Sequence, residues 1–199
     1  MWLEVETKVK LNSSDVPELR EKIKRIARFK ARGKKADDYF AIKSKGYPKK
    51  AFRIRAMKNK FEVNFKKHLK KYWTKEIVVK KEFEFQLKGK DEVESLLTLF
   101  NDLNFVEWVR KIKWNETYKH KKDKRISIEI NRVKHLGYFM EIEYLCKPRE
   151  MKKGRRKILR VLKELDIKPS QIDNTGYTRM LWDKGTKEKR KFLERSING

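Results

Sequence analysis

Short segments in which apolar and polar residues alternate recur along this chain, and they limit most strongly what it can fold into. Alternation with a period of two places apolar side chains on one face of a β-strand and polar side chains on the other. Helical patterns lie between some of these segments. Many strands with few helices predict an antiparallel sheet or barrel with helices packed on it. The strand-like segments cover residues 3–9, 52–56, 61–66, 82–85, 126–131 and 140–144, with a weaker one at 109–114, and helices are expected at about 15–29, 91–103, 155–165 and 176–182.

The polar faces of these segments carry charges that are separated by sign. In an ordinary half-exposed sheet the polar face mixes both signs, because opposite charges on neighbouring strands attract and like charges repel. Residues two apart on a strand lie on the same side, about 6.5–7 Å apart, so paired carboxylates repel unless a cation lies near them. The pattern therefore favours a site for hard cations and phosphate oxygens over a solvated sheet face that carries such pairs by chance. The pairs are Glu4/Glu6, Glu82/Glu84, Glu141/Glu143 and Arg53/Arg55.

The net charge also points to an anionic ligand. The 199 residues include 55 Lys and Arg against 28 Asp and Glu, which gives a formal net charge of +27. A field of that sign attracts nucleic acid, anionic membranes or small phosphorylated ligands. Aromatic residues make up 12% of the chain, enough for a core although 42% of the residues are charged. We expect one domain over residues 1–183, followed by a basic tail at 184–199.

Several other classes of site find no support in the sequence. The single cysteine, Cys146, excludes an internal disulfide and fits a reducing compartment, and we expect its thiol to be buried and inert. The three histidines lack the spacing of zinc ligands, and the chain has no Gly-rich phosphate loop. The sequence starts without a secretory signal, and no apolar run approaches the ~20 residues of a membrane span. These features predict a soluble, cytoplasmic protein with no membrane partner.

A loop at 67–76 interleaves Tyr72 and Trp73 with lysines. That mixture suits single-stranded nucleic acid, because aromatic rings stack on bases while lysines contact phosphates. The simpler interpretation is a solvated hairpin tip. The loop and the basic tail are candidate contacts for nucleic acid or polyphosphate on the exterior, where salt would screen them.

A series of motifs in a fixed order makes the expected site more specific. The series begins with Glu-x-Glu-x-Lys at 4–8 and ends with Leu-Gly-Tyr-Phe-Met-Glu-Ile-Glu at 136–143. Between them stand Asp-Asp-Tyr-Phe at 37–40, Phe-Arg-Ile-Arg at 52–55, Lys66 and Glu-Phe-Glu at 82–84. In this order the chain resembles the CYTH family, or triphosphate tunnel metalloenzymes, over about residues 3–182. The family includes class IV adenylate cyclases, thiamine triphosphatases and inorganic triphosphatases.

The resemblance implies an α+β fold, an eight-stranded antiparallel β-barrel or tunnel with helices packed on the outside. It also implies that the charged interior binds a triphosphate-containing small molecule together with Mg²⁺ or Mn²⁺. Glu82, Glu84 and Glu129 are weaker candidates that could instead pair with interior cations. The implied phosphate ligands are Lys8, Arg53, Arg55, Lys66, Lys111 and Lys113, the implied metal ligands are Glu4, Glu6, Glu141 and Glu143, and the implied catalytic residues are Glu4, Glu6, Lys8, Arg53 and Arg55.

Three positions depart from the family pattern. Asn131 stands where an Asp is common, and the lost charge would change the number of metals or their ligation. Lys113 stands where an Arg is frequent, so it offers a point charge in place of a forked donor. Thr175 occupies a position before Tyr177 where a Lys or Ser is often found.

The sequence favours a metal-dependent phosphohydrolase that removes the terminal phosphoryl group of tripolyphosphate or of a nucleoside or organic triphosphate. A class IV adenylate cyclase, which makes cyclic AMP and pyrophosphate from ATP, is the first alternative. Such cyclases tend to carry a His-Phe segment before Glu-x-Glu-x-Lys, whereas only Met1, Trp2 and Leu3 precede Glu4 here. The second alternative is a protein that binds polyanions or RNA, including the 5′-triphosphate end of RNA.

Overall fold

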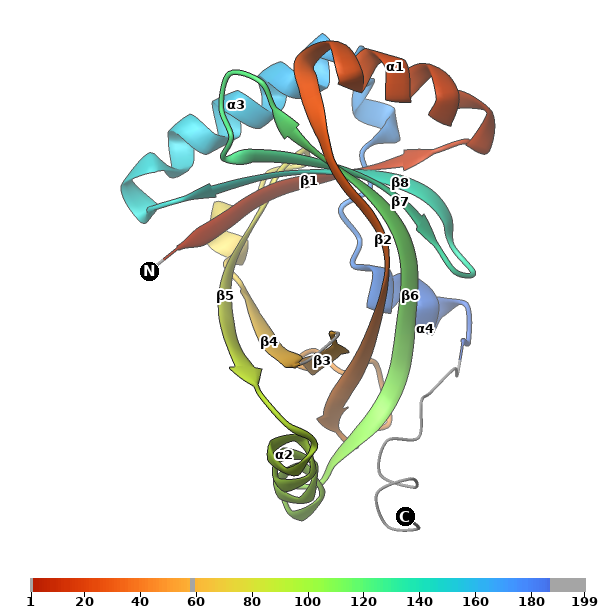
Figure 1. Cartoon of the computed structure of the whole chain (residues 1–199), viewed down its shortest axis with the longest axis vertical. Coiled ribbons are helices and arrows are strands. Elements are labelled where there is room, and N and C mark those ends of the chain that lie inside the picture. The colour runs from red at the N-terminus through yellow and green to blue at the C-terminus, as the bar shows by residue number, and fades with distance from the viewer. Residues whose placement is uncertain (1, 58–59, 187–199) are drawn as a thin grey trace. The chain divides into compact units, whose positions relative to one another are not determined.

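The computed structural model describes residues 2–57 and 60–186. In these residues eight antiparallel strands form a closed barrel in the order β1-β5-β4-β3-β2-β6-β7-β8, with four α-helices outside it (Figure 1). The predicted α+β barrel with external helices is confirmed. The strands are β1 (Leu3–Leu11), β2 (Ala27–Ile42), β3 (Phe52–Ala56), β4 (Phe61–His68), β5 (Val78–Leu87), β6 (Phe105–His120), β7 (Ile126–Val133) and β8 (Gly137–Cys146), and the helices are α1 (Val16–Ile26), α2 (Lys90–Asp102), α3 (Met151–Glu164) and α4 (Tyr177–Asp183).

The chain divides into two compact units, and four of the strands contribute residues to both. The first unit contains β1, β7, β8, α1 and α3, together with one end of β2, β4, β5 and β6. The second unit contains β3, α2 and α4, together with the other ends of those four strands. The first unit comprises residues 1–34, 67–82 and 113–175, and the second comprises 35–66, 83–112 and the chain from 176 onward.

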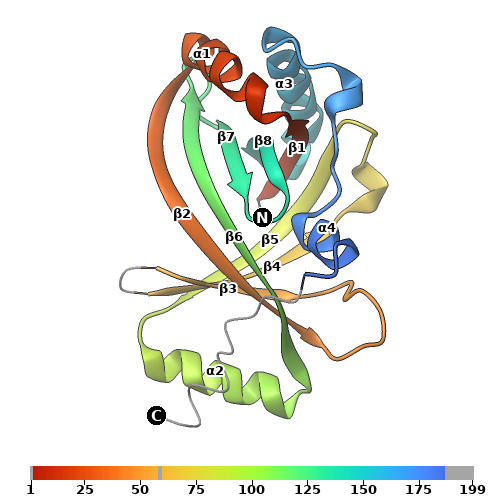
Figure 2. The same ribbon diagram turned by 90° about the vertical axis from the view of Figure 1, so that its right-hand side faces the viewer.

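In the first unit, α1 and α3 cover one face of the sheet made by β1, β7 and β8 (Figures 1 and 2). Every second residue of β7, namely Ile126, Ile128 and Ile130, is buried in this core, which confirms the period-two pattern. The opposite face of the same strands carries the charged residues. Cys146 is also buried here, and burial raises the pKa of its thiol, as expected for an inert cysteine.

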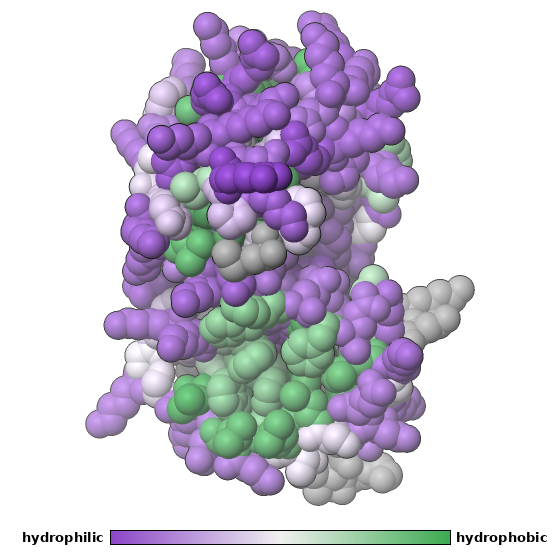
Figure 3. Space-filling model, turned by 90° about the vertical axis from the view of Figure 1, so that its left-hand side faces the viewer, coloured by the Kyte–Doolittle hydropathy of each residue, from purple (hydrophilic) through white to green (hydrophobic). Residues whose placement is uncertain are grey.

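In the second unit, α2 packs Val93, Leu97 and Phe100 against buried residues of β2, β3 and β4. Ile54 and Val63 are among these strand residues, and they belong to the alternating segments found in the sequence. Figure 3 shows an apolar area on the surface of this part of the chain. Two phenylalanines of β5 in this unit, Phe83 and Phe85, remain exposed.

Strand β2 is the element that the alternation of residues did not predict. The helical pattern was expected to continue to about residue 29, but α1 ends at Ile26 and β2 begins at Ala27. Residues 28–34 alternate cations with Phe29, Ala31 and Gly33, but all seven are exposed and only Phe29 is a large apolar residue, so the pattern is too weak to indicate a half-buried strand. Every other strand except β3 is also longer than predicted. The largest differences are in β5, which already begins at Val78, and in β6, which spans Phe105–His120.

The segment 67–76 is more ordered than a solvated hairpin tip. It contains the end of β4 and a short 3-10 helix at Lys70–Tyr72. Tyr72 and Trp73 pack partly buried against the core of the first unit, and Trp73 Nε1 donates a hydrogen bond to the carbonyl oxygen of Val79 at 3.0 Å. These two rings therefore serve the core, and they are poorly placed to stack on bases.

The predicted basic tail begins at Lys184, directly after α4, and from residue 187 it lies outside the described residues. In the part of the chain that the structure describes, no helix is long and apolar enough to cross a membrane.

The contact between α3 and β8 depends on Gly154. A Cβ atom added there would lie 2.7 Å from Cδ1 of Tyr144 and 3.4 Å from Cγ2 of Val5. Gly154→Leu should therefore lower the free energy of unfolding by about 1–3 kcal/mol, a loss of several degrees in Tm for a chain of this size. Thermal melting followed by circular dichroism measures this effect. Gly46→Leu is the matched control, because no atom lies within 4 Å of the added Cβ there, and equal losses in the two variants would contradict the close contact.

Candidate active site

Glutamates face each other across neighbouring strands of the first unit, on the sheet face opposite α1 and α3. The register places Glu6 of β1 opposite Glu143 of β8, and Glu129 of β7 opposite Glu141 of β8. Like charges directly opposite each other destabilise a sheet. This arrangement therefore requires cations close to the carboxylates.

Lysines supply those cations. Lys113 of β6 places its Nζ 2.8 Å from a carboxylate oxygen of Glu129 and 3.2 Å from one of Glu141. Lys80 of β5 forms an ion pair with Glu6. Burial acts to raise the pKa of Glu141, and Glu6 and Glu129 act in the same direction, but the charges of Lys113 and Lys8 outweigh them and lower it. Glu141 is thus held ionised by the neighbouring lysines.

Lys8 is a buried lysine at the centre of the predicted site. It lies opposite Glu141 in the register, and it is only 4% exposed. Its Nζ donates a hydrogen bond to the backbone carbonyl of Thr175 and lies 5.7 Å from the ring centroid of Phe139. Because Thr175 makes this contact through its backbone, the departure of its side chain from the family pattern does not affect it. Burial lowers the pKa of Lys8 to about 8, although Glu141 and Glu6 oppose this shift.

Two buried amides stand beside the carboxylates. Asn115 of β6 lies directly opposite Asn131 of β7, and the two are 4% and 0% exposed. Asn131 Nδ2 donates a hydrogen bond to Glu141 at 2.7 Å. Among the described residues, Oδ1 of each amide is buried without a hydrogen-bond partner. An unpaired buried oxygen is costly, and such an oxygen is a suitable ligand for a hard cation.

A second cluster of charges lies in the second unit around Asp37, which is completely buried. Arg55 binds this carboxylate through two hydrogen bonds of 2.5 and 3.0 Å, and Lys111 Nζ lies 2.8 Å from it. Burial acts to raise the pKa of Asp37, but the charges of Lys111 and Arg55 hold it far below its ordinary value. Asp37 is therefore the fixed counter-ion of two predicted phosphate ligands.

The remaining charges of this cluster are also paired. Arg53 forms an ion pair with Glu62, and Arg55 Nη1 lies 3.4 Å from the same carboxylate. Lys111 Nζ donates a hydrogen bond to the hydroxyl oxygen of Tyr39 at 3.2 Å. Each of these cations has more than one donor hydrogen, so it can contact phosphate oxygens while keeping part of its present pairing.

The structure brings most of the predicted residues together, but in two groups that belong to different units. Glu4 is buried on β1, two residues before Glu6. Lys66 lies two residues after Asn64 on β4, and Asn64 in turn donates a hydrogen bond to Glu84 at 3.4 Å. The first group contains Glu4, Glu6, Lys8, Lys113, Glu129, Glu141, Glu143 and Glu82, and the second contains Arg53, Arg55, Lys66, Glu84 and Lys111.

Four residues of these clusters were not assigned to the site from the sequence: Lys80, Asp37, Glu62 and Asn115. Glu62 alternates with apolar neighbours on its strand, so its face could have been predicted but its pairing with arginines could not. Asp37 was recognised only as part of a motif. Lys80 was missed because the strand was expected to start at residue 82, whereas β5 begins at Val78.

The donor set of the first cluster fits a hard divalent cation. Within the described residues, no group of three or more His, Cys, Asp or Glu side chains is arranged to hold a metal ion. Mg²⁺ commonly uses one or two carboxylates, with phosphate oxygens and water completing its shell. The carboxylates of Glu6, Glu129 and Glu141, with the unpaired Asn131 Oδ1 beside Glu141, offer oxygen ligands of this kind.

Comparisons with known proteins bear on the family and the fold of the chain. The model of the CYTH domain matches residues 3–177, and a search of curated proteins by sequence found no match. The structure is similar to protein PH1819 of Pyrococcus horikoshii OT3, with 25% identity, a TM-score of 0.69 and coverage of 91% of this chain and 99% of that chain. It is also similar to HpAC1 of Hippeastrum, assigned as an adenylyl cyclase but with a dominant triphosphatase activity (16% identity, TM-score 0.63, coverage 98% and 99%). The triphosphatase of the mimivirus capping enzyme shares the fold at 14% identity, with a TM-score of 0.51 and coverage of 82% and 89%.

The lowered pKa of Lys8 gives a test of how the site affects stability. Below about pH 8 the folded protein carries a buried charge on Lys8, whereas between pH 8 and the ordinary pKa of 10.5 only the unfolded chain binds that proton. The titration of Lys8 therefore raises the free energy of unfolding as the pH rises through this window. Lys8→Met removes the buried charge, so it should raise the free energy of unfolding at neutral pH by up to about 3 kcal/mol, and the gain should vanish near pH 10.5.

Urea denaturation of both proteins at pH 7 and pH 10 measures this difference. Lys24→Met on α1 is the control, because the Lys24 side chain is about half exposed. If Lys8→Met is less stable than the wild type at pH 7, Lys8 contributes to stability and the predicted penalty is absent.

Proposed function

Because this chain belongs to the CYTH family, we propose that it is a divalent-metal-dependent triphosphatase. Its substrate is tripolyphosphate or a nucleoside or organic triphosphate, and it removes the terminal phosphoryl group. The observation that supports this most is the partly buried network in which glutamates lie opposite each other and pair with lysines of other strands. Such a network costs stability unless it binds a ligand that carries both phosphates and a metal.

In this proposal the cations bind the phosphate oxygens. Lys8 and Lys113 of the first cluster act as point charges, and Arg53 and Arg55 of the second cluster donate forked hydrogen bonds. The present partners of these groups are carboxylates and a backbone carbonyl. A triphosphate offers oxygens of the same kind with more charge, so it can exchange with those partners.

Carboxylates of the first cluster hold the metal in this proposal. Glu4, Glu6, Glu141 and Glu143 are the proposed ligands, with Oδ1 of Asn131 as a neutral one. Mg²⁺ or Mn²⁺ supplies neutralisation of the phosphate charge and a more acidic water. Glu129, which also bonds Lys113 and the hydroxyl of Thr117, accepts a hydrogen bond from the attacking water and orients it. Phosphoryl transfer needs little beyond this positioning and neutralisation.

Hydrolysis is favoured over cyclisation because of what each reaction requires. A cyclase must hold the ribose so that its 3′-oxygen attacks the α-phosphate, which demands contacts to the nucleoside. A hydrolase needs only a water in line with the terminal phosphate. The side chains assigned to the two clusters suit phosphate and metal, and the similar protein from Hippeastrum has a dominant triphosphatase activity.

Incubation with ATP and Mg²⁺ or Mn²⁺ tests the reaction. We expect ADP and phosphate as products, separated and quantified by ion-exchange chromatography, and no turnover in the presence of a chelator. A panel of tripolyphosphate, ATP, thiamine triphosphate and triphosphorylated RNA then ranks the substrates by kcat/KM. Cyclic AMP and pyrophosphate as the main products would instead identify a cyclase, and a lack of turnover on the whole panel would leave a binding protein.

Neutralising one carboxylate tests the metal ligands. Glu6→Gln keeps the shape of the side chain but removes its charge, so we expect kcat/KM to fall on the order of 100-fold and the metal concentration for half-maximal activity to rise. Thermal melting checks that the variant is folded. Glu21→Gln on α1 is the control, since Glu21 is an exposed carboxylate paired with Lys24. A wild-type rate for Glu6→Gln would exclude Glu6 from the metal site.

A further inference from the structure

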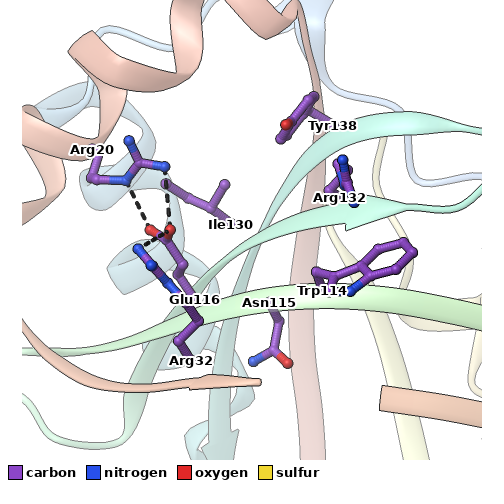
Figure 4. A pocket seen from close by; sticks show the side chains of 8 residues that line it. All are labelled: Arg20, Arg32, Trp114, Asn115, Glu116, Ile130, Arg132 and Tyr138. Carbon is purple, nitrogen blue, oxygen red and sulfur yellow. Dashed lines mark hydrogen bonds and ion pairs between the residues drawn. The ribbon is translucent and has the colours of Figure 1, made fainter. Parts of the chain in front are cut away.

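A pocket on the outer face of the first unit shares Asn115 with the candidate active site but none of its charged residues. Its volume is about 350 Å³, which is within the range of small-ligand pockets. Figure 4 shows Arg20 of α1 and Arg32 of β2 directed toward Glu116 of β6, with Trp114 and Arg132 nearby on β6 and β7. Residues alternate along a strand, so Trp114 and Glu116 point away from the face that carries Lys113.

The register lines up an aromatic platform beside this pocket. Trp114 lies opposite Arg132, and Arg132 lies opposite Tyr138, so the three side chains form one row across β6, β7 and β8. The Arg132 guanidinium carbon is 4.4 Å from the ring centroid of Trp114, and Lys34 Nζ is 5.8 Å from the same ring. Arg132 is exposed, whereas Trp114 and Tyr138 are half-buried. The rings are therefore fixed by the sheet, while the cation above Trp114 can move.

The charges around the platform are not balanced. Glu116 accepts two hydrogen bonds from Arg20, at 2.9 and 3.2 Å, and one from Arg32 at 2.8 Å. Within the described residues Arg132 has no carboxylate partner, and the pocket has three arginines for one glutamate. Residues 28–34 of β2 add a line of exposed Arg and Lys that is roughly 20 Å long. This combination of ring, small pocket and line of cations suits a ligand with a flat ring and a repeated phosphate.

We propose that this outer pocket binds one nucleotide unit of single-stranded nucleic acid. The base stacks over Trp114, in the place that Arg132 now occupies, and Arg132 turns to the phosphate. The cations of β2 contact the neighbouring phosphates. Stacking on a fixed ring together with a positive groove is the general mode of single-strand binding. A free nucleotide shares the base and phosphate, and it would use the pocket without the β2 cations.

The experiment uses a fluorescein-labelled single-stranded RNA with a 5′-hydroxyl end, so that it offers no triphosphate to the candidate active site. Fluorescence anisotropy at one fixed salt concentration gives Kd. We expect Trp114→Ala to weaken binding roughly 5- to 100-fold, and Trp114→Phe to restore most of the affinity. Trp2→Ala is the matched control, because Trp2 is exposed and also lies beneath a cation, Lys147 Nζ, at 4.1 Å from its ring centroid.

Further binding measurements identify the ligand. Long-chain polyphosphate has no base, so its Kd should be the same for Trp114→Ala and the wild type, and tripolyphosphate turnover should also be unchanged. AMP that competes with the RNA at equal or lower concentration would identify a free nucleotide as the ligand of this pocket. Equal RNA affinity of the wild type and Trp114→Ala, or an equal loss in Trp2→Ala, would overturn the proposal. If Trp114→Ala does not fold, Arg132→Gln replaces it, since Arg132 is exposed and should cost several-fold in RNA affinity.

Discussion

Glutamates that face each other across adjacent strands repel, so the charged face of the first unit is stable only if cations lie close to them. Glu129 opposite Glu141 and Glu6 opposite Glu143 would repel, and the network holds together because lysines from other strands lie among them. Glu6, Glu129 and Glu141 are each bound by a lysine that can itself bind phosphate. A ligand that brings both a metal and phosphates can therefore exchange partners on both sides at once, whereas either alone would leave charges unpaired.

The charged face lowers the stability of the fold, and apolar residues on the opposite face of the same strands offset this loss. Alternate residues of β1, β7 and β8 are apolar and buried beneath α1 and α3, which gives the unit a continuous core. The charged side contains buried groups in unfavourable states, such as Lys8 with its lowered pKa and the unpaired amide oxygens of Asn115 and Asn131. Strain at a binding face that is supported by a core on the opposite face is typical of functional sites.

The sequence predicted which side chains share one face of a strand, but it did not predict which strands lie next to each other. Period-two alternation identified which side chains share a face of each strand, and the sign of the charges indicated a site. The pairing of Lys80 with Glu6, or of Arg53 with Glu62, depends on which strands lie side by side and in which register. Residues far apart in the sequence make these contacts, so local pattern does not contain them. Strand β2 was missed for another reason, since residues 28–34 are exposed and, of the residues that alternate with their cations, only Phe29 is large and apolar.

Strand β6 shows how one backbone can serve two kinds of ligand. Lys113 and Asn115 lie with the carboxylates on one face, while Trp114 and Glu116 belong to the outer pocket. A step of one residue along the strand changes the surroundings from a partly buried charge network to a half-buried ring beneath exposed cations. Asn115 is the one residue of the described active-site clusters that also lines the pocket, and neither proposal uses it to bind phosphate, so an RNA held at the outer pocket does not compete with a triphosphate for the same groups. A chain end that carries a triphosphate would then gain affinity from two independent contacts, and this gain would depend on the length of RNA between them.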